Sequence, residues 1–116
     1  PARKAASDLD IDLADGVGDA EYLRKLAEIL PALLARERPD LVFFNAGVDP
    51  HTDDKLGRLS LTDDGLARRE AFVLGSCLEV GIPVTGVIGG GYDADIDRLA
   101  RRHALLHRAA SEALKA

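Results

Sequence analysis

Cysteine is almost absent from this sequence, because Cys77 is the only one among 116 residues. A lone cysteine cannot form an internal disulfide, and no metal-ligand spacing surrounds it. Long apolar runs are also missing: none approaches the roughly 20 residues of a membrane-spanning helix, and the polar start lacks the apolar core of a signal peptide. These absences favour a soluble, cytoplasmic protein with no membrane partner.

An excess of positive charge is the second absence. Fifteen Lys and Arg stand against twenty Asp and Glu, which gives a net charge of -5. The basic residues alternate with acids along the expected helices, a pattern typical of solvated faces. A nucleic-acid partner, which would require clustered basic residues, is therefore not expected. The phosphate-binding motif G-x-x-x-x-G-K-[ST] is missing too, which excludes a P-loop.

The hydropathy pattern predicts one domain with alternating strands and helices. Two short apolar runs, 41–48 and 82–88, are expected to be buried strands. Three helices are expected at about 20–37, 62–81 and 93–114, the first of them capped by Asp19. Acids and apolar residues alternate over 7–15, which indicates an extended segment with one buried face. The βαβα order predicts an α/β fold with parallel strands.

Both expected strands stop at small residues and then present a polar side chain. Asp49 follows the first strand, and Tyr92 follows the second after the run Gly89-Gly90-Gly91. Because the carboxyl ends of parallel neighbours share one rim, where ligands bind in open α/β sheets, Asp49 and Tyr92 are candidate site residues. The alternative is that Asp49 only caps a turn and Tyr92 only packs.

Three other motifs in the sequence each allow an alternative interpretation. Residues 89–94 fit the dinucleotide pattern G-x-G-x-x-G/A, but no later strand carries a ribose-binding acid, so a tight turn is the better interpretation. His103 and His107 lie four residues apart on a helix, as metal ligands can, yet without a third ligand two solvent-facing histidines are expected. Asp49 could also be the phospho-acceptor of a receiver domain, although no Lys follows Ile88.

Three short segments, 45–51, 54–57 and 89–92, together resemble the C-terminal part of histone deacetylase family proteins, above all bacterial and class IV members. The likeness extends to residues 15–19 and to the Arg-rich last helix. The resemblance implies an arginase-like α/β/α sandwich around a parallel sheet. It also implies a hydrolase that removes acyl groups from lysine or related amines with the help of zinc.

Carried over residue by residue, the resemblance assigns Asp49 as a zinc ligand and Tyr92 as the residue whose hydroxyl polarises the scissile carbonyl. Gly90 and Gly91 would lie beside the substrate. The chemistry agrees, because zinc accepts carboxylate oxygen and a neutral Tyr hydroxyl can donate to a developing oxyanion.

Parts of the family pattern are missing from the sequence. The family's paired histidines are absent, and so is the separate Asp-x-His pair that lies upstream of the matched part in the family and supplies the other two zinc ligands. Residues 1–116 are therefore interpreted as the C-terminal part of a deacetylase domain whose intact form acts on an acyl-lysine or acyl-amine. Alone, the chain is expected to be inactive, to bind zinc weakly or not at all, and to self-associate through surface that the missing half would cover.

Overall fold

The computed structural model describes residues 6–115, which form three helices and two strands in the order αβαβα. The elements are α1 (Asp19–Glu37), β1 (Val42–Gly47), α2 (Asp63–Glu79), β2 (Val84–Gly89) and α3 (Ile96–Lys115). The strands pair in parallel along their whole length, which confirms the predicted α/β fold with parallel strands. No helix within residues 6–115 combines the length and apolar composition that crossing a bilayer requires.

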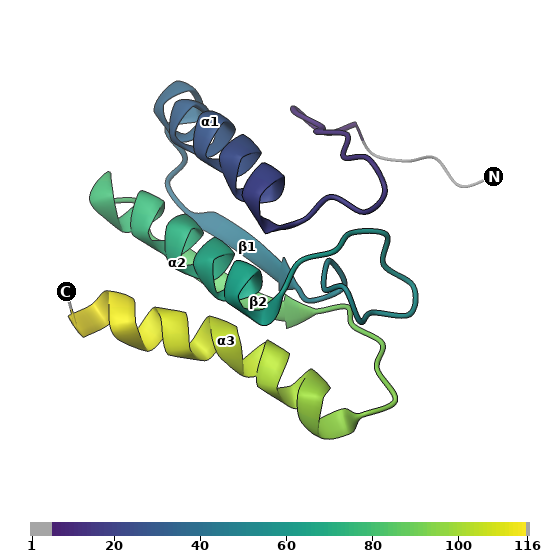
Figure 1. The fold of residues 1–116 in the computed structure, drawn as a ribbon. Helices are drawn as coiled ribbons and strands as arrows, with labels where there is room; N and C mark the ends of the chain where they lie inside the picture. Colours follow the sequence, from purple (N-terminus) through teal and green to yellow (C-terminus); the bar gives the residue numbers. More distant parts are fainter. Residues whose placement is uncertain (1–5, 116) are drawn as a thin grey trace.

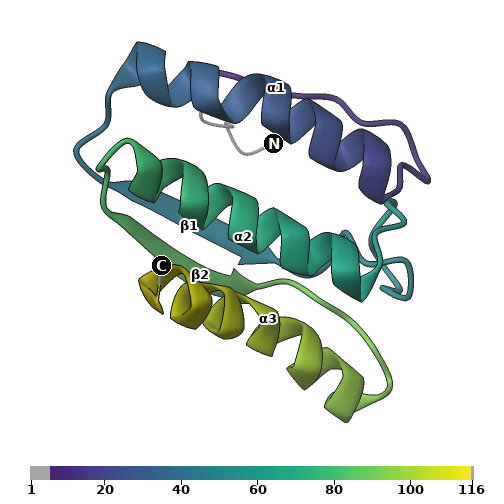
Figure 2. The same ribbon diagram turned by 60° about the vertical axis from the view of Figure 1, so that its left-hand side comes forward.

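The three helices lie side by side over one face of the sheet, with α2 between α1 and α3 (Figures 1 and 2). Alternate strand residues point to this face, as the period of two in a strand requires. Phe44, Ala46 and Val84 pack there against Leu74 of α2 and Leu106 of α3. This cluster joins both strands to the two helices that follow them in the chain.

The opposite face of the sheet is exposed. Phe43 and Val87 point away from the helices, and their side chains are 74% and 45% exposed. Asn45 and Thr85, which lie on the same face, are exposed as well. The fold is therefore a two-layer arrangement over residues 6–115, with one sheet face left open.

A second cluster fills the space near the carboxyl ends of the strands. Val48, Leu61 and Leu66 are almost completely buried, and Tyr22 of α1 and Leu99 of α3 pack against them. Residues from all three helices therefore contact the segment that follows β1. This packing gives the loops at that end a rigid support.

The helix starts differ in part from the sequence prediction. The second helix starts where expected: Thr62 caps α2, because its Oγ1 accepts a hydrogen bond from the Gly65 N–H at 3.0 Å. Asp19 does not cap α1: Gly18 holds the cap position, and the Asp19 carboxylate accepts the Thr62 N–H at 2.9 Å. Since Asp19 lies inside the first turn, its carboxylate is free to bind the start of α2.

Two further predictions were wrong in detail. Residues 7–15 are extended, but Leu9 and Ile11 are 44% and 43% exposed, so the expected buried face does not form. Alternation of polar and apolar residues predicts that a segment is extended, but it does not identify a neighbour that would cover the apolar face. The last helix starts at Ile96 rather than at Asp93, because Asp95 caps it by accepting the Arg98 N–H at 3.1 Å.

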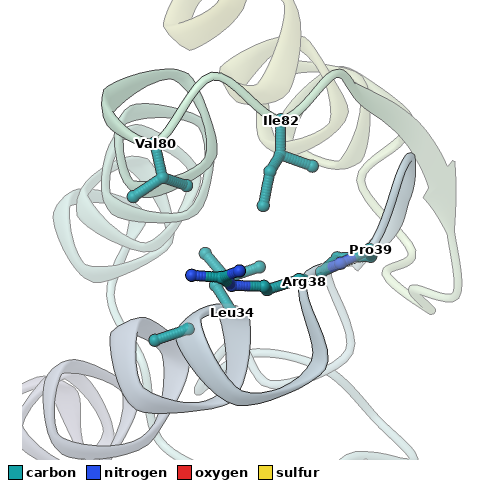
Figure 3. A pocket seen from close by; sticks show the side chains of 6 residues that line it. Leu34, Arg38, Pro39, Val80 and Ile82 are labelled. Carbon is teal, nitrogen blue, oxygen red and sulfur yellow. The ribbon is translucent and has the colours of Figure 1, made fainter.

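A hollow of about 460 Å³ lies at the amino-terminal ends of the strands (Figure 3). Leu34 and Arg38 from the end of α1 face Val80 and Ile82 across it, and Pro39 closes one side. Residues 38–39 precede β1 and residues 80–82 precede β2, so this hollow is at the far end of the sheet from Asp49. It does not belong to the candidate site.

Candidate active site

Asp49 and Tyr92 follow the carboxyl ends of the two paired strands. The Val48 N–H donates to the Gly89 carbonyl at 3.2 Å, which extends the strand pairing to the residue before Asp49. Asp49 is exposed beyond this point. The two candidate residues predicted from the sequence are therefore on loops that leave the same rim of the sheet.

The glycines between β2 and Tyr92 are required by space and by backbone conformation. Gly90 and Gly91 have φ angles of +61° and +98°, a region that side chains with a Cβ rarely adopt. A Cβ on Gly90 would lie 2.6 Å from Asp49 Oδ1, and one on Gly91 would lie 2.7 Å from a Val48 methyl carbon. The bare backbone thus lets the Asp49 carboxylate lie directly against the second loop.

Asp54 ties the two loops together. Its Oδ1 accepts the Tyr92 N–H at 2.6 Å, and its Oδ2 accepts the Leu56 and Gly57 N–H groups at 3.0 and 2.7 Å. The Lys55 N–H also donates to the Tyr92 carbonyl at 3.2 Å. The Tyr92 backbone is therefore held at both its N–H and its carbonyl group, whereas its side chain is 57% exposed.

Arg69 and Glu70 of α2 form a buried ion pair beneath the end of β1. They are only 4% and 0% exposed, and Arg69 Nε lies 2.6 Å from Glu70 Oε1. Arg69 Nη2 donates to the Gly47 carbonyl at 2.8 Å, and the guanidinium lies 5.7 Å from the centre of the Phe44 ring. Arg69 thus holds the strand two residues before Asp49.

The pKa shifts of this pair reflect its burial. Desolvation disfavours the charged guanidinium, but the hydrogen bond and charge of Glu70 outweigh it and raise the pKa of Arg69. Burial also raises the pKa of the Glu70 carboxyl, with Arg69 opposing the shift. The expectation that the charges of this helix form a solvated face is wrong for these two residues, since period and charge alternation do not distinguish a buried pair from an exposed one.

Arg102 of α3 lies at the centre of a third polar cluster and is 3% exposed. Its Nη2 is 2.8 Å from Asp93 Oδ2 and 3.5 Å from Asp53 Oδ2, and its Nε is 3.8 Å from Asp63 Oδ1. His51, also buried, places Nε2 2.7 Å from the same Asp63 oxygen. The cluster borders a pocket of about 410 Å³ and joins both loops of the rim to α2 and α3.

The Oδ1 atom of Asp93 has two further partners near the start of α3. It accepts the Asp95 N–H at 2.8 Å, and Arg98 Nη2 lies 3.3 Å from the same oxygen. The Asp95 hydrogen bond, followed by the two arginines Arg102 and Arg98, lowers the pKa of Asp93. The residue next to Tyr92 is therefore held as a charged group.

The histidine pair of α3 is less symmetrical than the sequence suggested. His107 is exposed as expected, but His103 is half-buried, and its Nδ1 is buried with no hydrogen-bond partner among the described residues. Within residues 6–115, no group of three His, Cys, Asp or Glu side chains is placed to hold a metal ion. These residues therefore do not by themselves fit a zinc site, for which three protein ligands are usual.

Comparison with known proteins decides the family. The histone deacetylase domain matches residues 2–108. The chain belongs to the histone deacetylase family. An uncharacterized protein of the cyanobacterium Picosynechococcus sp. is 53% identical over 97% of the chain, and a probable deacetylase of Methanothermobacter thermautotrophicus is 38% identical over 69% of it.

The chain spans only part of its deacetylase-family relatives. It covers 37% of the cyanobacterial protein and 23% of the archaeal one. An acetylpolyamine aminohydrolase from Burkholderia pseudomallei superposes on 87% of the chain with a TM-score of 0.72 and 22% identity, and the match covers 28% of that protein. This confirms the arginase/deacetylase fold for the matched part. The receiver interpretation of Asp49 is wrong, because the chain belongs to a different family.

Proposed function

We propose that residues 1–116 are the C-terminal part of a zinc-dependent deacetylase domain that removes acyl groups from lysine or related amines. We call this longer protein the intact domain. One observation carries the proposal: the loops of Asp49 and Tyr92 meet at one rim, where Asp54 Oδ1 accepts a hydrogen bond from the Tyr92 N–H at 2.6 Å. Family membership and the match to an acetylpolyamine aminohydrolase support the substrate class.

Tyr92 would act through its hydroxyl. When water adds to the carbonyl carbon of the acyl group, negative charge develops on the carbonyl oxygen, and a fixed donor stabilises it more than it stabilises the ground state. The Tyr92 backbone is held by Asp54, and its exposed ring can reach a substrate outside the rim. Gly90 and Gly91 would leave room for the acyl group beside it.

Asp49 would supply one ligand of the zinc ion in the intact domain. Zinc bound there would supply a Lewis acid for the carbonyl and a more acidic water. Its other ligands must come from outside the 116 residues, since within residues 6–115 no two further His, Cys, Asp or Glu side chains join Asp49 in a group that could hold a metal ion. The chain alone should therefore have no deacetylase activity.

The test compares the intact domain with the chain alone. Release of acetate from an acetyl-lysine peptide and from an acetylated polyamine is measured before and after removal of metal with a chelator. The intact domain should lose activity with its zinc and regain it when zinc returns. An intact domain that hydrolyses neither substrate, or a chain that hydrolyses either one alone, would contradict the proposal.

Zinc is expected to bind weakly to the isolated chain, because a single carboxylate leaves the ion mostly hydrated. Calorimetric titration of zinc measures this directly. A tight one-to-one complex that disappears on Asp49→Ala would count against the incomplete site. Tight binding that disappears on His103→Ala would instead identify the α3 histidines as ligands.

We also propose that the isolated chain self-associates through the open sheet face. Phe43 is 74% exposed there, and within residues 6–115 each strand has one edge without a neighbouring strand, which can pair with another chain. Light scattering at increasing concentration should show dimers or larger species, and Phe43→Ser should reduce them. A strictly monomeric wild-type chain at high concentration would contradict this expectation.

A further inference from the structure

Tyr92 has little side-chain packing to fix its direction. Its ring is 57% exposed, so its position depends on the backbone of the loop between β2 and α3. Asp54 holds the Tyr92 N–H from one side. On the other side the next residue, Asp93, must be fixed as well, because consecutive Cα atoms are only about 3.8 Å apart and a shift in one moves the other.

Asp93 is held by Arg102 through an ion pair, although its Oδ2 has no hydrogen bond among the described residues. The distance of 2.8 Å between Arg102 Nη2 and Asp93 Oδ2 is the shortest of the contacts that Arg102 makes to acids. Both side chains are largely buried, with exposures of 2% and 4%. Arg102 lies on the helix that also packs against Gly91 through Leu99, so the loop is anchored to a rigid element at two points.

The same guanidinium contacts the loop that follows Asp49. Arg102 Nη2 is 3.5 Å from Asp53 Oδ2, and Asp53 itself donates its N–H to His51 Nδ1 at 3.0 Å. The Nε contacts Asp63, the first residue of α2, at 3.8 Å. One buried side chain therefore joins the loop of Tyr92, the loop of Asp49 and the start of α2.

A contribution to stability alone does not explain why the Arg102 guanidinium is buried in this cluster. Its Nη1 is buried without a hydrogen-bond partner among the described residues, which is unfavourable for a charged group. A buried ion pair is often no better for stability than apolar residues of similar volume, whereas it does impose a specific arrangement on its partners. The cluster is thus better suited to fixing the two loops than to strengthening the fold.

We propose that Arg102 is a positioning residue for the deacetylase reaction, which sets the direction of the Tyr92 hydroxyl by holding Asp93 and Asp53. This inference rests on the proposed function for its catalytic consequence. The tie between the loops is a property of the 116-residue chain and can be measured without any activity.

The first experiment measures amide hydrogen exchange in the isolated chain. Arg102→Met should accelerate exchange at the Tyr92 N–H and Lys55 N–H, which bond the two loops together, while the amides paired between β1 and β2 exchange as in the wild type. Asp93→Asn should have the same effect and serves if Arg102→Met does not fold. Arg101→Gln, an exposed neighbour, is the matched control and should change neither amide.

The second experiment uses the intact domain. Arg102→Met should lower kcat by about 10- to 100-fold with KM and zinc content unchanged, because a small misplacement of a catalytic group has costs of this size. In a Tyr92→Phe background the same substitution should cause no further loss, since the group it positions is gone.

Two results would overturn the inference. Wild-type exchange at the Tyr92 amide in both Arg102→Met and Asp93→Asn would show that Arg102 does not hold the loop. An equal loss of kcat with and without the Tyr92 hydroxyl would show that it acts elsewhere. An intact domain without deacetylase activity would contradict the proposed function instead, and the exchange experiment would still decide whether Arg102 fixes the loops.

Discussion

Replacing Tyr92 by Phe in the intact domain is expected to lower turnover by roughly 10²–10³-fold, or about 3 kcal/mol of transition-state stabilisation. The substitution removes one donor and nothing else: the Tyr92 N–H still bonds to Asp54, and a ring that is 57% exposed leaves no cavity. Zinc content and thermal stability should therefore remain at wild-type values. Steady-state kinetics with an acetyl-lysine peptide, together with metal analysis, provide the measurement.

The controls for this prediction are within the chain. Tyr22, the other tyrosine, packs against the Val48 cluster, so Tyr22→Phe should leave turnover within about twofold of the wild type. Asp49→Asn should lose zinc and activity together, because an amide is a poor zinc ligand. Unimpaired turnover in Tyr92→Phe would remove the catalytic role proposed for this residue.

The largest effect on stability is expected at Glu70. Glu70→Gln keeps the shape of the side chain but leaves the buried Arg69 guanidinium without its counter-charge. Removing one partner of a buried pair typically costs about 3–5 kcal/mol, a large part of the total stability of a small domain. Urea unfolding of the 116-residue chain, followed by circular dichroism, should show a lower midpoint or a chain that is already unfolded.

A matched substitution and a double variant identify the cause. Glu28 pairs with Arg24 on the surface of α1, where both side chains are more than half exposed, so Glu28→Gln should cost only about 0.3–0.5 kcal/mol. Replacing both buried partners, Arg69→Met with Glu70→Leu, should recover most of the lost stability, because no charge is then left unpaired. A loss below about 1 kcal/mol in Glu70→Gln would mean that water reaches the guanidinium.

The order of the elements and the rim of the sheet could be predicted from the sequence. Short apolar runs ending in Asp49 and in the glycines before Tyr92 carry enough local information, because strand period and turn residues are local properties. The start of the second helix at residue 62 could be predicted for the same reason. Asp19 was misassigned because its carboxylate binds an N–H that lies 43 residues away in the chain.

The groups that support the rim could not be predicted in this way. Arg69, Glu70 and Arg102 lie on helices rich in charge, and their burial depends on which helix face meets the strands. In the sequence, Asp54 is one of several acids between the expected first strand and the second helix. Its function as a tie between the loops depends on the Tyr92 N–H, which is brought close only when β2 pairs with β1.

The constant register of the two strands also constrains how the chain folds. Val42 pairs with Val84 and Gly47 with Gly89, so the two partners of every pair are 42 residues apart in the sequence. No hydrogen bond of the sheet can form as a local hairpin, and each must await the closure of a long loop. Helix α2, which occupies the middle of that loop, shortens the distance to be closed once it is formed. Assembly of the rim is therefore a late event that depends on this helix, and substitutions in α2 should slow refolding more than equally destabilising ones in α1.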